Sequence, residues 1–209
     1  MWHFQRRFSK AGLGKTVGIG LMALSEGAIM TVRGRLVLYV GPMFAGKSAH
    51  LIAAAKRQTD VLALKPGFDT RDGSELVSRD GSHLAAVSAN AWPEDADRYS
   101  HIVLDEGQFW VAPHYHGDIV EDIRAARARG ADVTVGGLDT DYRRVPFDVM
   151  TRLMDEADEV IALTARCHVC GAPAAWTAKT HETGHLLETG DQELYEARCD
   201  AHWTLPDRP

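Results

Sequence analysis

The sequence has few cysteines, little positive charge and no long apolar segment, and each of these shortages excludes a class of protein. No apolar run approaches the roughly 18 residues that a membrane-spanning helix needs, so we expect no membrane association. Three cysteines cannot all pair with one another, which is typical of a reducing compartment, and we expect a cytoplasmic protein. The 29 acidic residues outnumber the 23 basic ones, and the resulting net charge of −6 disfavours a general nucleic-acid-binding protein.

The first residues lack the hydrophobic patterning of the rest of the chain. They are glycine-rich and weakly apolar, but Lys15 and Glu26 interrupt the apolar stretch, unlike in a secretory signal peptide. The letters GLGKT occur there without a preceding hydrophobic strand, so we interpret them as a chance match to a phosphate-binding motif. We predict that residues 1–34 are an N-terminal extension that is dispensable or disordered.

From residue 35 on, short apolar runs alternate with helical segments. The continuous apolar run at 36–40 is typical of a parallel strand that is buried on both faces. We expect strands at 36–40, 60–65, 101–106, 131–138 and 158–163, and helices at 48–57 and 119–130. This alternation predicts an α/β domain over residues 35–163, with a mainly parallel sheet flanked by helices.

The letters GPMFAGKS directly follow the first expected strand and precede a helix. Their G-x-x-x-x-G-K-S spacing in this context predicts a phosphate-binding loop and a P-loop NTPase-like fold. Backbone N–H groups and the helix dipole would converge on the phosphates, Lys47 would contact the outer phosphates, and Ser48 would hold Mg²⁺. The predicted nucleotide-binding residues of this loop are Gly41, Pro42, Met43, Phe44, Ala45, Gly46, Lys47 and Ser48.

The letters VLDEGQF at 103–109 place two carboxylates at the end of another expected strand. Asp105 is suited to hold Mg²⁺ from the side opposite Ser48. Glu106 follows it and is suited to polarise a nucleophile that attacks the γ-phosphate. The pair therefore predicts phosphoryl transfer or nucleotide hydrolysis.

Two C-x-x-C/H pairs near the C-terminus predict one zinc site. Their spacing suits two knuckles that close a tetrahedral site, and 28 residues between them would form a protruding loop. Four protein ligands leave no open position, so the site would be structural. We expect a small zinc-ribbon-like subdomain at 164–209, with the ligands Cys167, Cys170, Cys199 and His202.

Several motifs occur in the order found in type II (cytosolic-type) thymidine kinases, and the chain resembles this family over roughly residues 35–203. They are GPMFAGKS, DTR at 69–71, LDEGQF, GLDTDYRRVPF at 137–147, and TARCHVCGAPA followed by YEARCDAH. The resemblance implies transfer of the γ-phosphate of ATP to the 5′-hydroxyl of thymidine or deoxyuridine. It also implies a homotetramer and feedback by thymidine triphosphate.

The same resemblance implies roles for individual residues. Glu106 is expected to be the general base, and the segment between the two knuckles is expected to be a zinc-anchored lasso loop that closes over thymine. On the ATP side, the implied residues beyond the loop are Asp105, Glu106, Gly107 and Gln108. The implied nucleoside-binding residues are Met43, Asp69, Arg71, Phe109, Leu138, Tyr142 and Tyr195.

Two other kinds of protein fit part of this pattern. In a P-loop ATPase with a structural zinc site, Glu106 would activate water instead of an alcohol. A zinc-ribbon protein that binds nucleic acid would need a basic ribbon, whereas residues 181–202 are acidic with Arg198 as their one arginine. A nucleoside kinase explains the most motifs.

Overall fold

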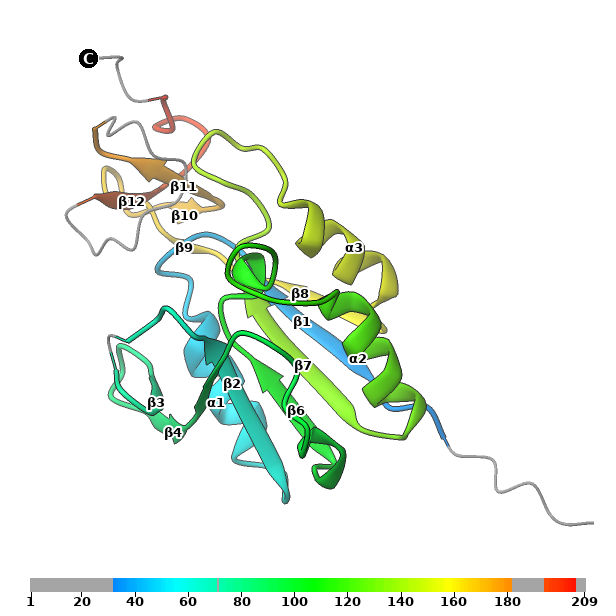
Figure 1. The fold of residues 1–209 in the computed structure, drawn as a ribbon. Coiled ribbons are helices and arrows are strands. Elements are labelled where there is room, and N and C mark those ends of the chain that lie inside the picture. Colours follow the sequence, from blue (N-terminus) through cyan, green and yellow to red (C-terminus); the bar gives the residue numbers. More distant parts are fainter. Residues whose placement is uncertain (1–31, 71, 182–193, 206–209) are drawn as a thin grey trace, which may run out of the picture. The chain divides into compact units, whose positions relative to one another are not determined.

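The computed structural model describes residues 32–70, 72–181 and 194–205 (Figure 1). These residues belong to one compact unit, Thr31–Pro209. Three of the predicted features fall on other residues: most of the N-terminal extension, Arg71, and the middle of the lasso segment at 182–193. Among the described residues, no helix has both the length and the apolar character needed to cross a membrane.

A six-stranded parallel sheet forms the centre of the described structure, in the order β5-β2-β6-β7-β1-β8. Its strands are β1 (Leu36–Val40), β2 (Val61–Pro66), β5 (Val87–Ala89), β6 (His101–Leu104), β7 (Asp132–Gly137) and β8 (Glu159–Ala162). The predicted α/β fold is thereby confirmed. All five expected strands are present with ends shifted by at most two residues, whereas β5 was not expected.

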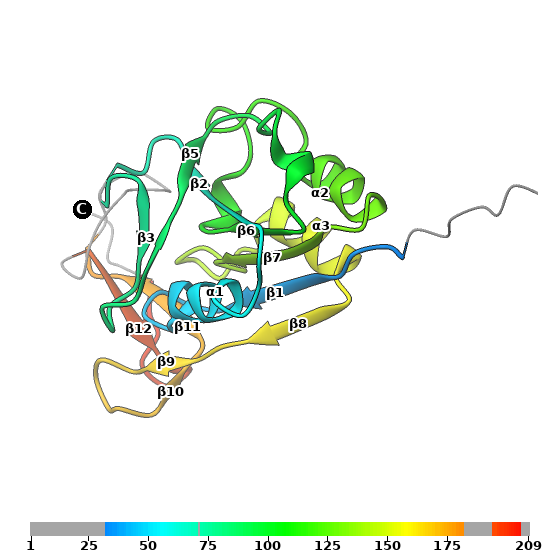
Figure 2. The same cartoon turned by 90° about the horizontal axis from the view of Figure 1, so that it is seen from below.

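The sheet has helices on both faces because its strands are apolar on both sides. Ile102 and Leu104 of β6 belong to a buried cluster with residues of α2 and α3, whereas Val103 between them packs with residues of α1. Figure 2 shows α1 on one side of β1 and β7, and α2 and α3 on the other. The helices are α1 (Lys47–Ala55), α2 (Ile119–Ala128) and α3 (Asp148–Glu156); α3 was not expected.

Shorter elements lie in the connections between the strands of the central sheet. One hairpin pairs β3 (Glu75–Val77) with β4 (His83–Ala85), and two short 3₁₀ helices are η1 (Ala96–Arg98) and η2 (Gly107–Phe109). Beyond the sheet lie the antiparallel pairs β9 (Ala165–Arg166) with β10 (Pro173–Ala174) and β11 (Trp176–Lys179) with β12 (Tyr195–Arg198). These last strands carry the cysteine and histidine cluster. The predicted boundary between residues 163 and 164 stays a prediction.

Candidate functional site

The phosphate-loop candidate turns tightly from β1 into α1. Gly41 has a φ of 143°, and a Cβ atom there would lie 2.4 Å from the carbonyl oxygen of Leu163, so any side chain would clash with backbone. Phe44 has a φ of 69°, which is uncommon for a residue with a side chain. Such outliers persist where the surrounding structure holds them, often at ligand sites. The loop therefore has a backbone that is shaped for close approach by a ligand.

The Lys47 ammonium lies over the loop. Its Nζ atom donates hydrogen bonds to the carbonyl oxygens of Gly41 and Pro42, at 3.1 and 2.7 Å. Burial lowers the pKa of Lys47, and the negative charges of Glu106 and Asp105 oppose this effect. A buried ammonium beside two carboxylates is a strong local cation that an incoming phosphate can contact.

Ser48 and Asp105 meet across an intervening strand. The Ser48 hydroxyl donates to Asp105 Oδ2 at 3.0 Å, although β7 lies between the strands that precede these two residues. Gly136 in β7 permits the approach, because a Cβ atom there would lie 2.7 Å from Leu51 Cδ1 of α1. The absence of a side chain therefore lets α1 pack against the sheet close enough to join the two motifs.

Asp105 has the electrostatics of a cation ligand. Burial raises its pKa to about 7, and the negative charge of Glu106 acts in the same direction. A divalent cation would relieve this repulsion, and carboxylate and hydroxyl oxygens are ligands that Mg²⁺ accepts. The adjacent oxygens of Ser48 and Asp105 therefore fit the predicted magnesium site.

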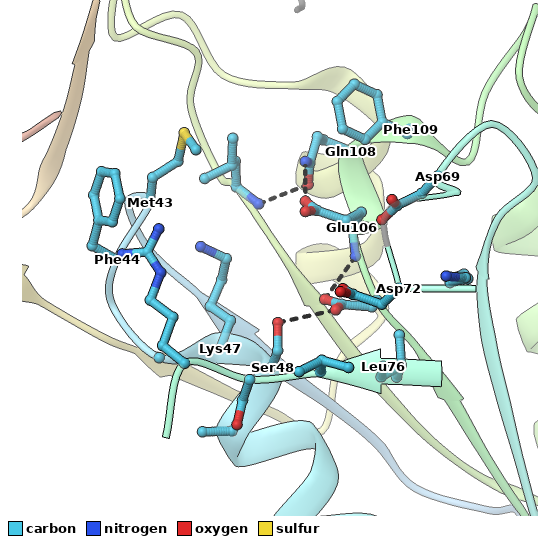
Figure 3. A pocket seen from close by; sticks show the side chains of 18 of the residues that line it. Met43, Phe44, Lys47, Ser48, Asp69, Asp72, Leu76, Glu106, Gln108 and Phe109 are labelled. Atoms are coloured by element: carbon cyan, nitrogen blue, oxygen red, sulfur yellow. Dashed lines mark hydrogen bonds between the residues drawn. The ribbon is translucent and has the colours of Figure 1, made fainter. Parts of the chain in front are cut away.

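Glu106 is fixed by a chain of hydrogen bonds (Figure 3). Gln108 donates from Nε2 to Glu106 Oε2 at 2.7 Å, and its Oε1 accepts from the Leu138 N–H at 2.9 Å. Glu106 also has a left-handed backbone, with a φ of 51°. The carboxylate is thus oriented by side-chain and backbone constraints together, as a positioned base requires.

One cavity of about 730 Å³ joins these groups to the predicted nucleoside side. Lys47, Ser48, Asp105, Glu106 and Gln108 line it. The predicted nucleoside-binding residues that line the same cavity are Met43, Asp69, Phe109, Leu138, Tyr142 and Tyr195. The phosphate-loop residues Phe44 and Gly46 also line it, whereas Gly41, Pro42, Ala45 and Gly107 support its walls without lining it. The structure therefore brings together segments that are far apart in the sequence.

Sequence reasoning missed several residues of this cavity, among them Phe68, Arg79 and Thr177. Phe68 packs its ring 5.0 Å from that of Phe109, and the Thr177 hydroxyl accepts a hydrogen bond from the Met43 N–H at 2.9 Å. Arg79 lies over the ring of Phe44. The letters ELVSRDGSHLA around Arg79, two short alternating runs that flank a turn, could have indicated the hairpin that carries it.

The four predicted zinc ligands form one cluster. All their ligand atoms lie within 4.8 Å of one another. The Cys170 and Cys199 sulfur atoms are 3.8 Å apart, and His202 Nδ1 is 3.3 Å from Cys199 Sγ and 3.9 Å from Cys167 Sγ. Zinc–sulfur bonds of about 2.3 Å at tetrahedral angles place two sulfurs about 3.8 Å apart. The donor set and the spacing therefore fit a tetrahedral zinc ion.

Arg144 connects the region of the zinc cluster to the wall of the cavity. The guanidinium carbon of Arg144 lies 4.0 Å from the ring centres of both Trp176 and Trp203. Arg144 Nη2 lies 3.2 Å from an Asp200 carboxylate oxygen, which also accepts a hydrogen bond from Trp176 Nε1 at 2.8 Å. The loop between β7 and α3, which carries both Arg144 and Tyr142, is thereby attached to the zinc-binding strands (Figure 1).

Comparisons with known proteins agree with this geometry. A family model described as thymidine kinase matches residues 34–203. The thymidine kinase of Mycoplasma genitalium is 33% identical over 193 residues, which cover 87% of this chain and 88% of that protein. The thymidine kinase of Mesomycoplasma hyopneumoniae (strain 7448) is 36% identical over 182 residues, covering 82% and 96%, and that of Mycoplasmoides gallisepticum is 34% identical over 203 residues, covering 88% and 87%.

Proposed function

The chain belongs to the thymidine kinase family, and we propose that it transfers the γ-phosphate of ATP to the 5′-hydroxyl of thymidine. The observation that carries this proposal is the position of Glu106. Its carboxylate lines one cavity with the phosphate loop and is held there by Gln108. An alcohol between the two would lose its proton to Glu106 while its oxygen attacks phosphorus.

In this proposal the phosphate loop and its neighbours neutralise the negative charge of the phosphate oxygens during transfer. Phosphoryl transfer passes through a loose transition state, so catalysis depends on positioning and on neutralising the phosphate oxygens. Lys47 would contact the outer phosphates. Ser48 and Asp105 would hold Mg²⁺, which would supply positive charge that neutralises the charge developing on the phosphate. Gln108 keeps the general base oriented through its bond to Glu106.

The nucleoside lies on the opposite side of the cavity. Phe109, Leu138 and Tyr142 supply apolar and aromatic surface for the base, and Asp69 supplies a carboxylate near the reacting centre. Tyr195 lies at the start of β12, in the C-terminal part of the lasso segment, and would contribute near the sugar. Arg71, which falls outside the described residues, is inferred from the family resemblance to act with Asp69 near the reacting phosphates. Exclusion of water by the lasso would prevent ATP hydrolysis.

The zinc ion has a structural role in this proposal. Cys167, Cys170, Cys199 and His202 hold it, and no position is left for chemistry. It would hold in place β11 and β12, which pair with each other and flank residues 182–193 in the sequence. We infer in addition that the enzyme is cytoplasmic, accepts deoxyuridine, forms a homotetramer and is inhibited by thymidine triphosphate. Light scattering tests the homotetramer, and a kinase assay with added thymidine triphosphate tests the inhibition.

A nucleoside panel tests the proposed function directly. With γ-labelled ATP and Mg²⁺, we expect label to appear in the monophosphates of thymidine and deoxyuridine and not in those of purine nucleosides. Label in inorganic phosphate at a rate that thymidine does not change would instead favour the P-loop ATPase. A protein that transfers label to none of the nucleosides would contradict the proposal.

A further inference from the structure

Arg79 lines the same cavity as the phosphate loop, although it belongs to the turn between β3 and β4. Its guanidinium carbon lies 4.1 Å from the centre of the Phe44 ring, which is in the middle of that loop. The side chain is therefore directed across the cavity toward the residues that surround the phosphates.

The turn that carries Arg79 is held by its own hydrogen bonds. The Asp80 carboxylate accepts from the Ser82 N–H at 2.9 Å and from the Ser78 hydroxyl. The Ser78 N–H donates to the Ser82 carbonyl at 2.8 Å, and the Gly81 N–H donates to the Ser78 carbonyl at 3.0 Å. A turn ordered in this way loses little conformational entropy when a ligand binds.

The hairpin is also attached to the helix that follows the phosphate loop. Leu76 of β3 is 4% exposed and packs in one cluster with Leu51, Ile52 and Ala55 of α1. Since α1 begins at Lys47, the hairpin and the phosphate loop have a common support. The position of Arg79 relative to the loop is therefore determined by core packing.

Phe44 determines how the guanidinium is presented. Its ring lies 5.0 Å from that of His168 in an edge-to-face contact, and it packs on the buried cluster around Cys167. Arg79 lies over the face of the Phe44 ring, in a cation–π contact that holds the guanidinium beside the loop. The N–H donors of a guanidinium lie in its plane, at the edge, and form a fork that matches phosphate oxygens.

Two of the basic side chains that line the cavity lie close to each other, although acidic side chains, among them Asp80, Asp105 and Glu106, line it as well. Lys47 and Arg79 are close enough for the positive charge of Arg79 to lower the pKa of Lys47, in addition to the larger effect of burial. A ligand with several negative charges that lies between these two cations relieves their mutual repulsion.

We propose that Arg79 is a second cationic ligand of the ATP triphosphate, donating hydrogen bonds to non-bridging phosphate oxygens opposite Lys47. This inference rests on the proposed function, because that function identifies the bound nucleotide as ATP. The contact exists in the ground state, so its loss weakens ATP binding and does not depend on which nucleoside is phosphorylated. Charge-assisted hydrogen bonds of this kind correspond to an affinity change of about 10- to 100-fold.

Binding measurements on variants of the full chain test this role. Calorimetry with Mg²⁺–ATP, Mg²⁺–ADP, adenosine and thymidine is compared for the original chain, Arg79→Ala and Arg79→Lys. We expect Arg79→Ala to bind ATP about 10- to 100-fold more weakly and to bind adenosine and thymidine unchanged. Arg79→Lys keeps the charge but not the planar fork, so its ATP affinity should lie between the two. Arg57→Ala is the control, because Arg57 is exposed and does not line the cavity.

The outcomes separate this proposal from the proposed function. An ATP affinity within twofold of the original in Arg79→Ala would overturn the role of Arg79, whatever the kinase activity. Equal losses for ATP, adenosine and thymidine would also overturn it, because they indicate a distorted cavity. If Arg79→Ala does not fold, Arg79→Lys and Arg79→Gln give the same comparison. A chain that binds ATP through Arg79 but phosphorylates no nucleoside would leave this inference standing and remove the proposed function.

Discussion

Glu106 combines a left-handed backbone with a carboxylate that Gln108 orients, and this constraint can be tested by one substitution. Glu106→Gln retains the shape of the side chain but cannot accept the proton of the 5′-hydroxyl. We expect the rate of thymidine phosphorylation to fall by about 10²- to 10⁴-fold, while ATP binding measured by calorimetry stays unchanged.

Lys47→Ala is the contrasting variant for this prediction. The Lys47 ammonium would contact phosphates already in the ground state, so its removal should lower both ATP binding and turnover. Turnover within a few-fold of the original in Glu106→Gln would show that another carboxylate is the base, and Asp69, which lines the same cavity, would be examined next.

Asp105 makes the stability of the ligand-free protein depend on pH. Its pKa is raised from 3.8 to about 7, so between these values the folded protein holds a proton that the unfolded chain has released. The contribution of this group to the free energy of unfolding therefore falls as pH rises from about 4 to about 7. Above pH 7 the carboxylate is ionised in both states, and its destabilisation of the folded protein no longer changes with pH. We expect Asp105→Asn to raise the free energy of unfolding by about 1 to 3 kcal/mol at pH 8 in denaturant titrations without Mg²⁺ or nucleotide.

At pH 5 the same substitution should raise the free energy of unfolding by less, because the original carboxyl is already protonated in the folded state at that pH. Equal effects at pH 5 and pH 8 would contradict the assignment of the shift to Asp105. The variant should also lose Mg²⁺-dependent kinase activity, because the amide lacks the charge that holds the cation.

At the scale of elements, the loop between β7 and α3 connects the base pocket to the zinc-binding strands. Asp141 accepts hydrogen bonds from the N–H groups of Arg143 and Val145, which fold the loop around Tyr142. Arg144 then lies between the rings of Trp176 and Trp203. We expect Arg144→Ala to raise the KM for thymidine about 3- to 10-fold and to leave the KM for ATP unchanged, since two cation–π contacts are worth about 1 to 2 kcal/mol.

Steady-state kinetics in which each substrate is varied in turn measure the KM for thymidine and the KM for ATP separately. Arg152→Ala is the matched control, because Arg152 also pairs with a carboxylate, that of Asp118, on an exposed surface away from the cavity. Arg144→Lys should recover only part of the effect, since an ammonium does not stack as a guanidinium does. An equal rise of both KM values in Arg144→Ala would show a general disturbance instead of a role at the pocket loop.

At the scale of the whole molecule, the zinc cluster supports both halves of the site. Thr177, in the strand that pairs with β12, accepts a hydrogen bond from Met43 of the phosphate loop, and Phe44 packs on the cluster around Cys167. We expect about one zinc per chain by elemental analysis of freshly purified protein. Cys199→Ser should lose the zinc and weaken both ATP and thymidine binding, unlike the Arg79 and Arg144 variants, which each affect one substrate.

Chelation of zinc from the original protein is the control for the cysteine substitution and should produce the same two losses. If protein purified without any chelator contained no zinc, the prediction of a zinc site would be wrong. Zinc loss with unchanged ATP affinity would show that the contacts of Met43 and Phe44 do not depend on the metal.

The sequence by itself determined the parts of this protein that depend on neighbouring residues. The continuous apolar run at 36–40 predicted β1 as a strand buried in a parallel sheet, and short apolar runs alternating with helical segments predicted the other four strands. The phosphate loop and the paired cysteines were predicted because their chemistry requires fixed residue types at fixed spacing. The motifs that share this order also predicted the family, which the comparisons confirm.

The tertiary structure alone decided which distant segments face one another. Met43 and Thr177 are 134 residues apart in the chain, and no local pattern relates them. The helix α3 escaped prediction because it is nine residues long and carries only Val149, Met150 and Leu153 as buried residues. Arg79 and Arg144 look like ordinary surface arginines in the sequence. Their aromatic partners come from other elements, so only the packing of those elements brings the cations to the phosphate loop and to the zinc-binding strands.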